Sequence, residues 1–290
     1  MIPMRIGDVR TDSSAKLAYH VACGMVHRLD VRGSENVTRL AGKSAVITGG
    51  GTGIGQAIAL AFAREGAQVV VAGRRKEKLD ETFHLLQQAG CSALALECDV
   101  TKAADTQRVV KSAEDAFGKV NVLVNNAGAL SVSTVENITE EDWDRVMATN
   151  VKGPFLMSRA ALPAMRRAGG GSIINVGSVL GIVAIRDRAA YCASKGGVSM
   201  LTKAMALDHA QDNIRVNCVC PSIVESDMTR NLFAETEVGQ QARESRLASI
   251  PLGRFGKPAD IAGLTVFLAS EESSWMTGTV IPVDGGVTAY

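Results

Sequence analysis

The stretch that decides the fold is Thr48-Gly49-Gly50-Gly51-Thr52-Gly53-Ile54-Gly55, a glycine-rich turn. It lies between an apolar run at Ser44–Thr48 and an amphipathic stretch at Ile54–Glu65. Glycines let the backbone approach a pyrophosphate, and the helix that follows supplies N–H donors and a positive partial charge. A bare glycine pattern also occurs in ordinary turns, but the strand before it and the helix after it favour a dinucleotide site.

Beyond this turn, short β-branched runs alternate with helical stretches that end at glycine. The alternation predicts an α/β fold, a doubly wound (Rossmann) parallel sheet of about seven strands with helices on both faces. Strands are expected at Ser44–Thr48, Gln68–Ala72, Ala93–Cys98, Val120–Asn125, Ser172–Val176, Ile214–Val219 and Val280–Val283. Helices are expected at Ile54–Glu65, Lys76–Ala89, Ala103–Phe117, Glu140–Arg167, Ala189–Ala210 and Ala259–Ala269.

The chain divides into an N-terminal part and one domain. Residues 1–40 have few periodic apolar positions and are predicted to be a flexible extension, whereas residues 41–290 form a single Rossmann-fold catalytic domain. A tether to a partner subunit, or a start at Met25, would also explain the extension. The rest of the chain has the composition of a folded globular protein, since 46% of all residues are hydrophobic and 21% are charged.

Charge and hydropathy narrow the possible partners and location. The 31 Lys and Arg against 30 Asp and Glu leave a formal charge of +1, so nucleic acid is not an expected partner. No apolar run is long enough to cross a membrane and no secretory signal is evident, which predicts a cytoplasmic protein. The cysteines and histidines lack metal-ligand spacing, so no metal site is expected, and Cys218-x-Cys220 is predicted to pack in the core.

Several motifs together resemble the short-chain dehydrogenase/reductase family, over about residues 41–290 and in the branch of 3-oxoacyl-carrier-protein reductases. They are the glycine turn, Asn125-Asn126-Ala127-Gly128, Ser178 thirteen residues before Tyr191, and Tyr191-Cys192-Ala193-Ser194-Lys195. The resemblance implies the catalytic residues Asn150, Ser178, Tyr191 and Lys195. It implies a cofactor site formed by Thr48, Gly49, Gly51, Thr52, Gly53, Ile54, Gly55, Arg74, Arg75, Asp99, Val100, Asn126, Ala127, Gly128, Tyr191, Lys195, Pro221, Ile223 and Ser226.

The spacing of Tyr191 and Lys195 supports acid/base chemistry independently of the resemblance. At i and i+4 of a helix the two side chains face the same way, and an ammonium near a phenol favours the phenolate. Tyr191 is therefore predicted to protonate a ketone oxygen during reduction and to accept the alcohol proton during oxidation. The alternative is a half-buried helix tyrosine with a surface lysine one turn later.

The resemblance adds the remaining roles and the reaction. It implies that Ser178 hydrogen-bonds the reacting oxygen, that Lys195 also holds the nicotinamide ribose, and that Asn150 supports a proton-relaying water. The reaction is an NAD(P)(H)-dependent interconversion of a secondary alcohol and a ketone by hydride transfer. Asn150 could instead satisfy backbone groups in an irregular helix turn. The sequence departs from the family at Pro221-Ser222, where glycine usually follows proline, and at Ser226, where threonine is usual.

The end of the second strand bears on the choice of nicotinamide. Gly73 stands where an acidic residue would bind the ribose hydroxyls and repel a 2′-phosphate. Arg74 and Arg75 follow and could bind that phosphate, which favours NADP(H) and leaves NAD(H) as the alternative. In the second case both arginines are solvated loop residues.

The substrate and the assembly are less constrained. A small-molecule alcohol or ketone, or an acyl-carrier-bound 3-oxoacyl group, is expected to meet Ile185–Arg188 and a lid at Glu225–Ile250. These segments contain five arginines: Arg186, Arg188, Arg230, Arg243 and Arg246. They would suit an anionic substrate, although the favoured interpretation is that they are solvated loop charges. The resemblance implies a homotetramer. A non-catalytic dinucleotide sensor and a structural subunit of a hetero-oligomer are the alternative functions.

Overall fold

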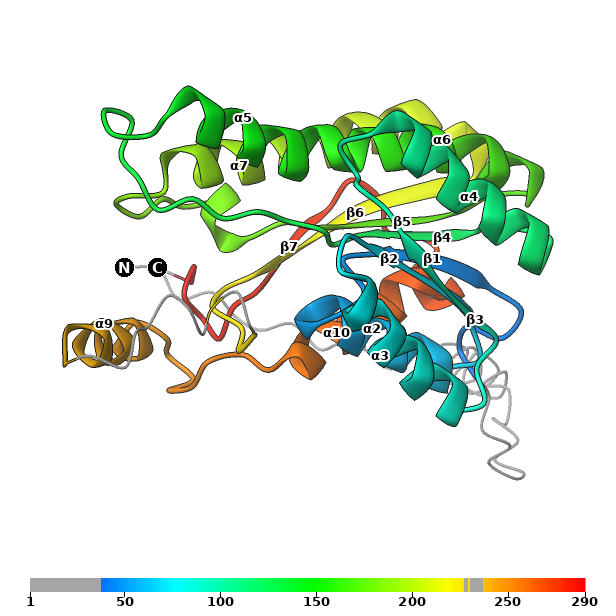
Figure 1. Cartoon of the computed structure of the whole chain (residues 1–290), viewed down its shortest axis with the longest axis horizontal. Helices are drawn as coiled ribbons and strands as arrows, with labels where there is room; N and C mark the ends of the chain where they lie inside the picture. The colour runs from blue at the N-terminus through cyan, green and yellow to red at the C-terminus, as the bar shows by residue number, and fades with distance from the viewer. Residues whose placement is uncertain (1–37, 227–228, 230–236, 290) are drawn as a thin grey trace, which may run out of the picture. The chain divides into compact units, whose positions relative to one another are not determined.

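The computed structural model describes residues 38–226, 229 and 237–289. These residues form one parallel sheet of seven strands in the order β3-β2-β1-β4-β5-β6-β7, which confirms the predicted doubly wound fold (Figure 1). The strands are β1 (Ser44–Thr48), β2 (Gln68–Gly73), β3 (Ala93–Glu97), β4 (Val122–Asn125), β5 (Gly171–Val176), β6 (Ile214–Pro221) and β7 (Val280–Val283). Their bounds differ from the expected ones by up to two residues, as strand ends often do.

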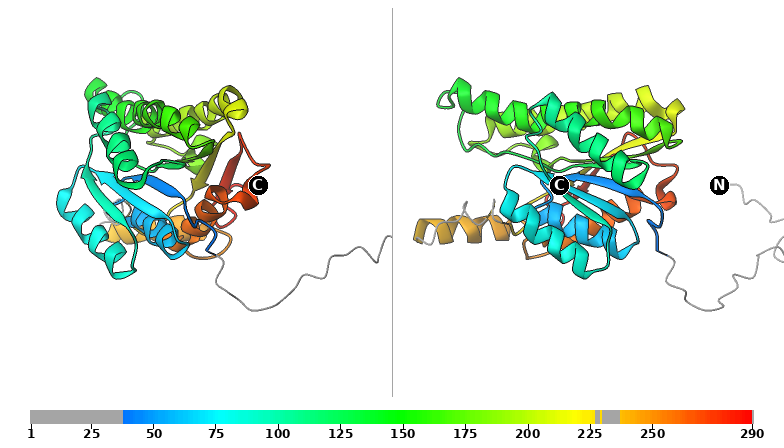
Figure 2. Two further views of the ribbon diagram at one scale, coloured as in Figure 1. Left: turned by 90° about the vertical axis from the view of Figure 1, so that its right-hand side faces the viewer. Right: turned by 45° about the vertical axis from the view of Figure 1, so that its right-hand side comes forward.

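Helices cover both faces of the sheet, as Figures 1 and 2 show. On one face lie α2 (Gly53–Arg64), α3 (Lys76–Gln88) and α10 (Pro258–Ala269). On the other lie α4 (Ala103–Phe117), α5 (Glu140–Met147), α6 (Gly153–Arg167) and α7 (Ala189–His209). A further helix, α9 (Glu237–Ala248), falls within the segment predicted to be a lid, and it projects beyond the carboxyl ends of the strands.

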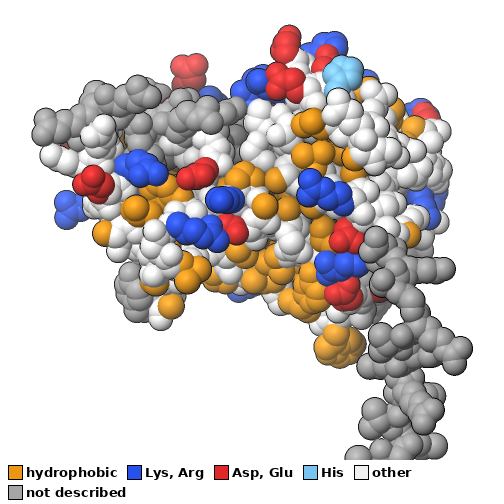
Figure 3. All heavy atoms as spheres, turned by 90° about the horizontal axis from the view of Figure 1, so that it is seen from below, with side chains coloured by type: hydrophobic (Ala, Val, Ile, Leu, Met, Phe, Trp, Pro, Cys, Tyr) orange, Lys and Arg blue, Asp and Glu red, His pale blue; other side chains and the backbone are white. Residues whose placement is uncertain are grey.

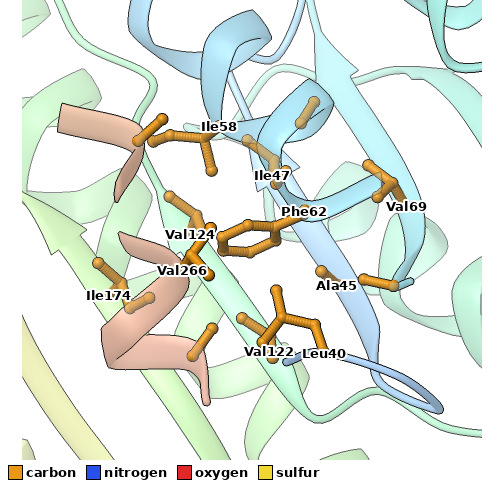
Figure 4. Packing of buried hydrophobic residues seen from close by; sticks show 14 of the residues in the cluster. Leu40, Ala45, Ile47, Ile58, Phe62, Val69, Val122, Val124, Ile174 and Val266 are labelled. Atoms are coloured by element: carbon orange, nitrogen blue, oxygen red, sulfur yellow. The ribbon is translucent and has the colours of Figure 1, made fainter. Parts of the chain in front are cut away.

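The strands are buried on both sides because their side chains alternate between two cores. Ala45 and Ile47 of β1 pack with Phe62 of α2 in one cluster, seen in Figure 4, whereas Val46 joins Met157 of α6 in the other. All five residues of β1 are buried. A run of apolar residues without alternation of polar ones is therefore what this central parallel strand requires.

The folded unit begins before the predicted domain boundary at residue 41. Leu40 has no exposed surface and belongs to the core that contains Phe62. The Arg39 backbone N–H donates to Glu65, and its guanidinium forms an ion pair with Glu272. These two residues, assigned to the extension from the sequence, are thus part of the domain. The rest of the predicted extension, residues 1–37, lies outside the described residues.

The prediction of one long helix over Glu140–Arg167 is wrong, because a π-helical turn at Ala148–Lys152 separates α5 from α6. Here the Gly153 N–H bonds to the carbonyl of Ala148, five residues back. Pro154 follows and has no N–H to donate to Asn150, four residues before it, so a regular α-helix cannot continue through this point. The wide turn holds Asn150, one of the predicted site residues.

The surface carries no single dominant charge on the face shown in Figure 3, where acidic and basic side chains are interspersed among hydrophobic ones. Within residues 38–226, 229 and 237–289, no helix combines the length and the hydropathy that a bilayer crossing requires.

Candidate active site

A cavity of about 450 Å³ opens at the carboxyl ends of the strands. In the sheet β1 and β4 are neighbours, although β2 and β3 lie between them in the chain, so the strand order reverses at this point. Open α/β sheets bind ligands at such a switch in strand order. The cavity is lined by the glycine turn, by the ends of β2, β4, β5 and β6, and by residues near the start of α7.

The glycine turn has the shape of a pyrophosphate cradle. Gly49 and Gly53 have φ of +65° and +56°, a region that favours glycine. A Cβ on Gly55 would lie 2.2 Å from the Gly49 carbonyl oxygen, so α2 can pack closely only with glycine there. The first turn of α2 has no acidic residue, and the side chain of Thr52 does not cap it. Its N–H groups are therefore suited to a bound anion, and the residues present fit a dinucleotide.

Thr48 and Asn126 connect the glycine turn to the end of β4. Thr48 Oγ1 accepts hydrogen bonds from the backbone N–H groups of Asn126 and Ala127, at 3.0 and 3.1 Å. Asn126 Nδ2 donates in return to the carbonyls of Thr48 and Gly49, at 3.0 and 3.1 Å. Thr48 is fully buried and does not line the cavity. It positions the two strand ends that do.

Two arginines line the cavity, and one of them contacts the glycine turn. Gly73, Arg74 and Arg75 line it beside Asp99. Arg75 Nη2 donates to Thr52 Oγ1 at 3.1 Å, so this guanidinium closes over the turn. Partial burial tends to raise the pKa of Asp99. Hydrogen bonds from Thr101 and the positive charges of Lys102 and Arg74 lower it by more, so the pKa of Asp99 lies below its usual value.

Tyr191, Lys195 and Ser178 all line the same cavity. Lys195 Nζ lies 5.7 Å from the centre of the Tyr191 ring and donates to the Val176 carbonyl at 2.8 Å. Lys195 is buried, while Tyr191 is half-buried and lines the cavity. Ser178 Oγ accepts from the Leu180 N–H at 3.1 Å and contacts the Pro221 carbonyl at 3.5 Å. The arrangement presents a phenol and a hydroxyl to the same space, with an ammonium one helical turn behind the phenol.

Asn150 does not line the cavity, because its amide is fully engaged in the protein interior. Its Oδ1 accepts from the Ala129 N–H at 2.7 Å, and its Nδ2 donates to the Ala129 carbonyl and to Ser194 Oγ, both at 2.9 Å. The side chain thus ties the segment after β4 to the helix that carries Tyr191. This contact pattern matches the structural alternative that the sequence left open for Asn150.

Comparisons with known proteins agree with this arrangement. The family model described as "Enoyl-(Acyl carrier protein) reductase" matches residues 49–288. A solved structure titled as a short-chain type dehydrogenase/reductase from Mycobacterium marinum superposes with a TM-score of 0.83 at 38% identity, covering 88% of this chain and 99% of the other. The chain belongs to the short-chain dehydrogenase/reductase family.

Two curated relatives in this oxidoreductase family show how its members differ. The 2-(S)-hydroxypropyl-CoM dehydrogenase 3 of Xanthobacter autotrophicus is 43% identical over 251 residues, which is 87% of this chain and 98% of the relative. The 3-oxoacyl-acyl-carrier-protein reductase of Thermotoga maritima is 42% identical over 249 residues, which is 86% of this chain and 99% of the relative. Family membership supports a nicotinamide-dependent enzyme acting on CH–OH groups.

Most of the residues that the sequence predicted for a short-chain dehydrogenase/reductase site line one cavity. They are Gly49, Thr52, Gly53, Ile54, Arg74, Arg75, Asp99, Val100, Asn126, Ala127, Gly128, Ser178, Tyr191, Lys195, Pro221 and Ser226. The predicted residues outside the lining are Thr48, Gly51, Gly55, Asn150 and Ile223. Gly51 packs against α3 instead, where a Cβ would lie 3.1 Å from Lys78.

Further residues that the motifs did not indicate also line the cavity. Many of them adjoin a recognised motif, so extending each motif by a few residues would have found them: Cys98, Ala129, Thr149, Val176, Gly177, Ser222, Val224 and Thr229. The predicted packing role of Cys218 and Cys220 is confirmed, since both are buried behind Gly177. A Cβ on Gly177 would lie 2.6 Å from the Cys218 sulfur, so these thiols fill the space under the cavity wall.

Proposed function

We propose that this protein is an NADP(H)-dependent oxidoreductase that interconverts a secondary alcohol and a ketone, with Tyr191 as general acid/base. The observation that carries the proposal is that Tyr191, Lys195 and Ser178 lie on the same cavity as a glycine turn shaped for a pyrophosphate. When bound, the nicotinamide supplies the hydride donor for reduction or the acceptor for oxidation. The protein supplies the proton and the orientation.

Tyr191 moves the proton in this proposal. Its hydroxyl would donate to the ketone oxygen as the alcohol forms, and in the reverse direction the phenolate would accept the alcohol proton. Lys195 stabilises the phenolate because a buried ammonium 5.7 Å from the ring acts through a medium less polarisable than water. Ser178 would donate a second hydrogen bond to the reacting oxygen. Its hydroxyl is available for this because its contact with the Pro221 carbonyl, at 3.5 Å, is long.

Asn150 is a positioning residue in this account. Its contacts hold the Ala129 segment against Ser194 and so fix the cavity wall relative to the Tyr191 helix. The π-helical turn displaces the Asn150 carbonyl from the regular α-helical pattern, because Pro154 cannot donate to it. A carbonyl without its helical partner is a good acceptor for a water that connects the site to solvent.

The cofactor would lie along the cavity from the arginines to Tyr191. The glycine turn and the start of α2 would take the pyrophosphate, and Lys195 would also reach the nicotinamide ribose. Val100 and Asp99 would contact the adenine. We propose NADP(H) over NAD(H) because Arg74 and Arg75 both line the cavity where Gly73 leaves no carboxylate to repel a 2′-phosphate.

The substrate is proposed to be a small alcohol or ketone, with an acyl-carrier-bound 3-oxoacyl group as the alternative. The names of the two curated relatives, a hydroxypropyl dehydrogenase and a 3-oxoacyl reductase, support an oxygen-bearing carbon as the reacting centre. A panel of carbonyl compounds, screened by the loss of NADPH absorbance, tests the proposal. We expect that at least one ketone is reduced to its secondary alcohol. Tight NADPH binding with no turnover across the panel would instead favour the non-catalytic sensor.

We further propose a homotetramer built from two kinds of contact between copies. On α7, Met200 and Leu207 are 63% and 83% exposed, and Phe155 on α6 is 44% exposed. Met200 and Leu207, seven residues apart, lie on one face of α7, and a second copy could cover that face across a two-fold axis. A different surface includes Trp275, which is 99% exposed just before the edge strand β7.

The assembly is expected to respond to charge placed on α7. Light scattering should report a tetramer for the wild type and a dimer for Leu207→Glu. The new carboxylate would be buried in the α7 contact and disrupt it, while the second kind of contact would remain. Val135→Glu is the matched control, since Val135 is 78% exposed in a loop outside both surfaces. A monomeric wild type at micromolar concentration would refute the tetramer.

A further inference from the structure

The end of strand β6 departs from the family pattern at a residue that lines the cavity. Ser222 follows Pro221 and stands where the family usually has glycine. Pro221 pairs with Val283 at the last step of the ladder between β6 and β7. One residue beyond that ladder, Ser222 Oγ donates to the Asp284 carbonyl at 3.0 Å. A glycine has no hydroxyl for this hydrogen bond, so the contact comes with the departure of this chain from its family.

The Asp284 carbonyl belongs to a tight turn at residues 284–288, here called the Asp284 turn. The Asp284 carboxylate accepts from the Gly286 N–H at 2.9 Å, and from the N–H and the hydroxyl of Thr288 at 2.8 and 2.7 Å. Burial tends to raise the pKa of Asp284, but these hydrogen bonds lower it by more, so the carboxylate is ionised at neutral pH. Hydrogen bonds to a charged acceptor are stronger than neutral ones, and these hold the turn closed on its first residue.

The Asp284 turn is also held from its other side, by the segment that follows α9. The Gly285 carbonyl accepts from the Leu252 N–H at 3.1 Å. Gly285 has φ of +68°, and a Cβ there would lie 2.7 Å from Cγ2 of the buried residue Ile250. Only glycine allows this backbone conformation and this close packing without strain. Contacts on two sides therefore fix the carbonyl that accepts from Ser222.

Pro221 and Ser222, here called the Pro221–Ser222 wall, lie beside the proposed catalytic residues. The Pro221 carbonyl is 3.5 Å from Ser178 Oγ. Both of these residues line the cavity that also holds Tyr191. In the proposed function the nicotinamide lies at Tyr191, so the wall would meet that end of the cofactor and not the phosphates at the glycine turn. Its placement matters, since an error of about 1 Å in positioning a reactant can lower a rate about a hundredfold.

We propose that the Asp284 turn braces the Pro221–Ser222 wall, which makes Ser222 and Thr288 positioning residues for the nicotinamide end of the cofactor. The inference rests on the proposed function and adds a control of its site by the carboxyl end of the chain. Ser222 forms the bond to the wall, while Thr288 holds the turn that supplies the acceptor. Without the brace, the wall would have to be ordered each time the cofactor binds, which weakens binding. Because the two residues act in series, losing both should add little to losing one.

The test compares two ligands that differ only in the nicotinamide, NADPH and its fragment 2′-phospho-ADP-ribose. Calorimetric titration measures the binding of each, so no turnover is needed. Ser222→Ala and Thr288→Val should each weaken NADPH binding by about three- to tenfold, the effect of losing one hydrogen bond. Binding of the fragment should not change. The double variant should bind NADPH about as well as the weaker of the two single variants.

Two further variants separate the brace from a general loss of structure. Ser249→Ala also removes a serine hydroxyl that donates to a backbone carbonyl, here that of Arg246 at 2.7 Å, but Ser249 is exposed and does not line the cavity. This variant should bind NADPH as the wild type does. Thr288→Ser keeps the hydroxyl that donates to Asp284 and should also retain the wild-type affinity.

Three results would overturn the brace: unchanged NADPH affinity in Ser222→Ala, equal weakening of NADPH and the fragment, or wild-type affinity in Thr288→Val. In the last case the serine would act without the turn. Titration with NADH and ADP-ribose makes the same comparison for a protein that does not bind the 2′-phosphate. If the expected binding differences occur but no ketone is reduced, the proposed function fails and the brace stands. If ketones are reduced and neither variant changes NADPH binding, the brace fails and the proposed function stands.

Discussion

Replacing Tyr191 with phenylalanine is expected to lower kcat at least about a hundredfold, because a positioned general acid/base contributes that much or more to proton transfer. The phenylalanine keeps the ring beside Lys195 and removes only the hydroxyl that faces the cavity. NADPH affinity, measured by fluorescence titration, should change little, since the residues proposed to bind the phosphates are on other elements. The initial rate of NADPH oxidation with a reactive ketone gives the loss.

Two variants separate the role of the hydroxyl from that of its surroundings. Lys195→Ala should lower turnover and also weaken NADPH binding, because its ammonium is assigned to both the phenolate and the ribose. Cys192→Ser, next to Tyr191 but outside the cavity lining, should behave like the wild type. Turnover retained in Tyr191→Phe would exclude Tyr191 as the acid/base.

Cofactor choice is the second large effect, and it depends on charge. A 2′-phosphate carries close to two negative charges, and binding it to Arg74 and Arg75 should contribute about 1.5–3 kcal/mol. Because about 1.4 kcal/mol is a factor of ten, kcat/KM should favour NADPH over NADH by roughly tenfold to a hundredfold. Asp99 lies within electrostatic range of Arg74, but the two form no ion pair, so the guanidinium keeps its capacity for a phosphate.

The preference is expected to reverse when the charges at the end of β2 are exchanged. In Gly73→Asp combined with Arg74→Ile, the new carboxylate would bind the free 2′-hydroxyl of NADH and repel the phosphate of NADPH. Lys76→Ile is the control for a lost charge nearby, because the Lys76 side chain is 62% exposed, pairs with Asp80 and does not line the cavity. A wild type that prefers NADH at matched ionic strength would show that the two arginines are solvated loop residues.

The order of strands and helices was predictable because each element carries its own local signal. The buried run at Ser44–Thr48, the glycines of the following turn and the apolar face of the next helix all specify the first βαβ unit without distant contacts. Parallel strands with right-handed crossovers then restrict the topology to very few arrangements. This is why the seven-stranded sheet could be expected from the sequence.

Other features depend on contacts that sequence reasoning did not reveal. The π-helical turn needs Pro154 and the engagement of Asn150 with Ala129, and a periodic apolar pattern continues across it unbroken. The burial of Leu40 depends on a helix that follows it in the chain.

The most direct test of the central claim is to follow the hydrogen that the reaction transfers. The wild-type protein would be incubated with NADPH deuterated at C4 of the nicotinamide and with a ketone that it consumes, and the alcohol product examined by NMR. The account predicts one deuterium on the carbinol carbon for one of the two C4 epimers of labelled NADPH, with the hydroxyl proton coming from solvent. Alcohol without deuterium from either labelled epimer, or no alcohol from any ketone despite tight NADPH binding, would contradict it.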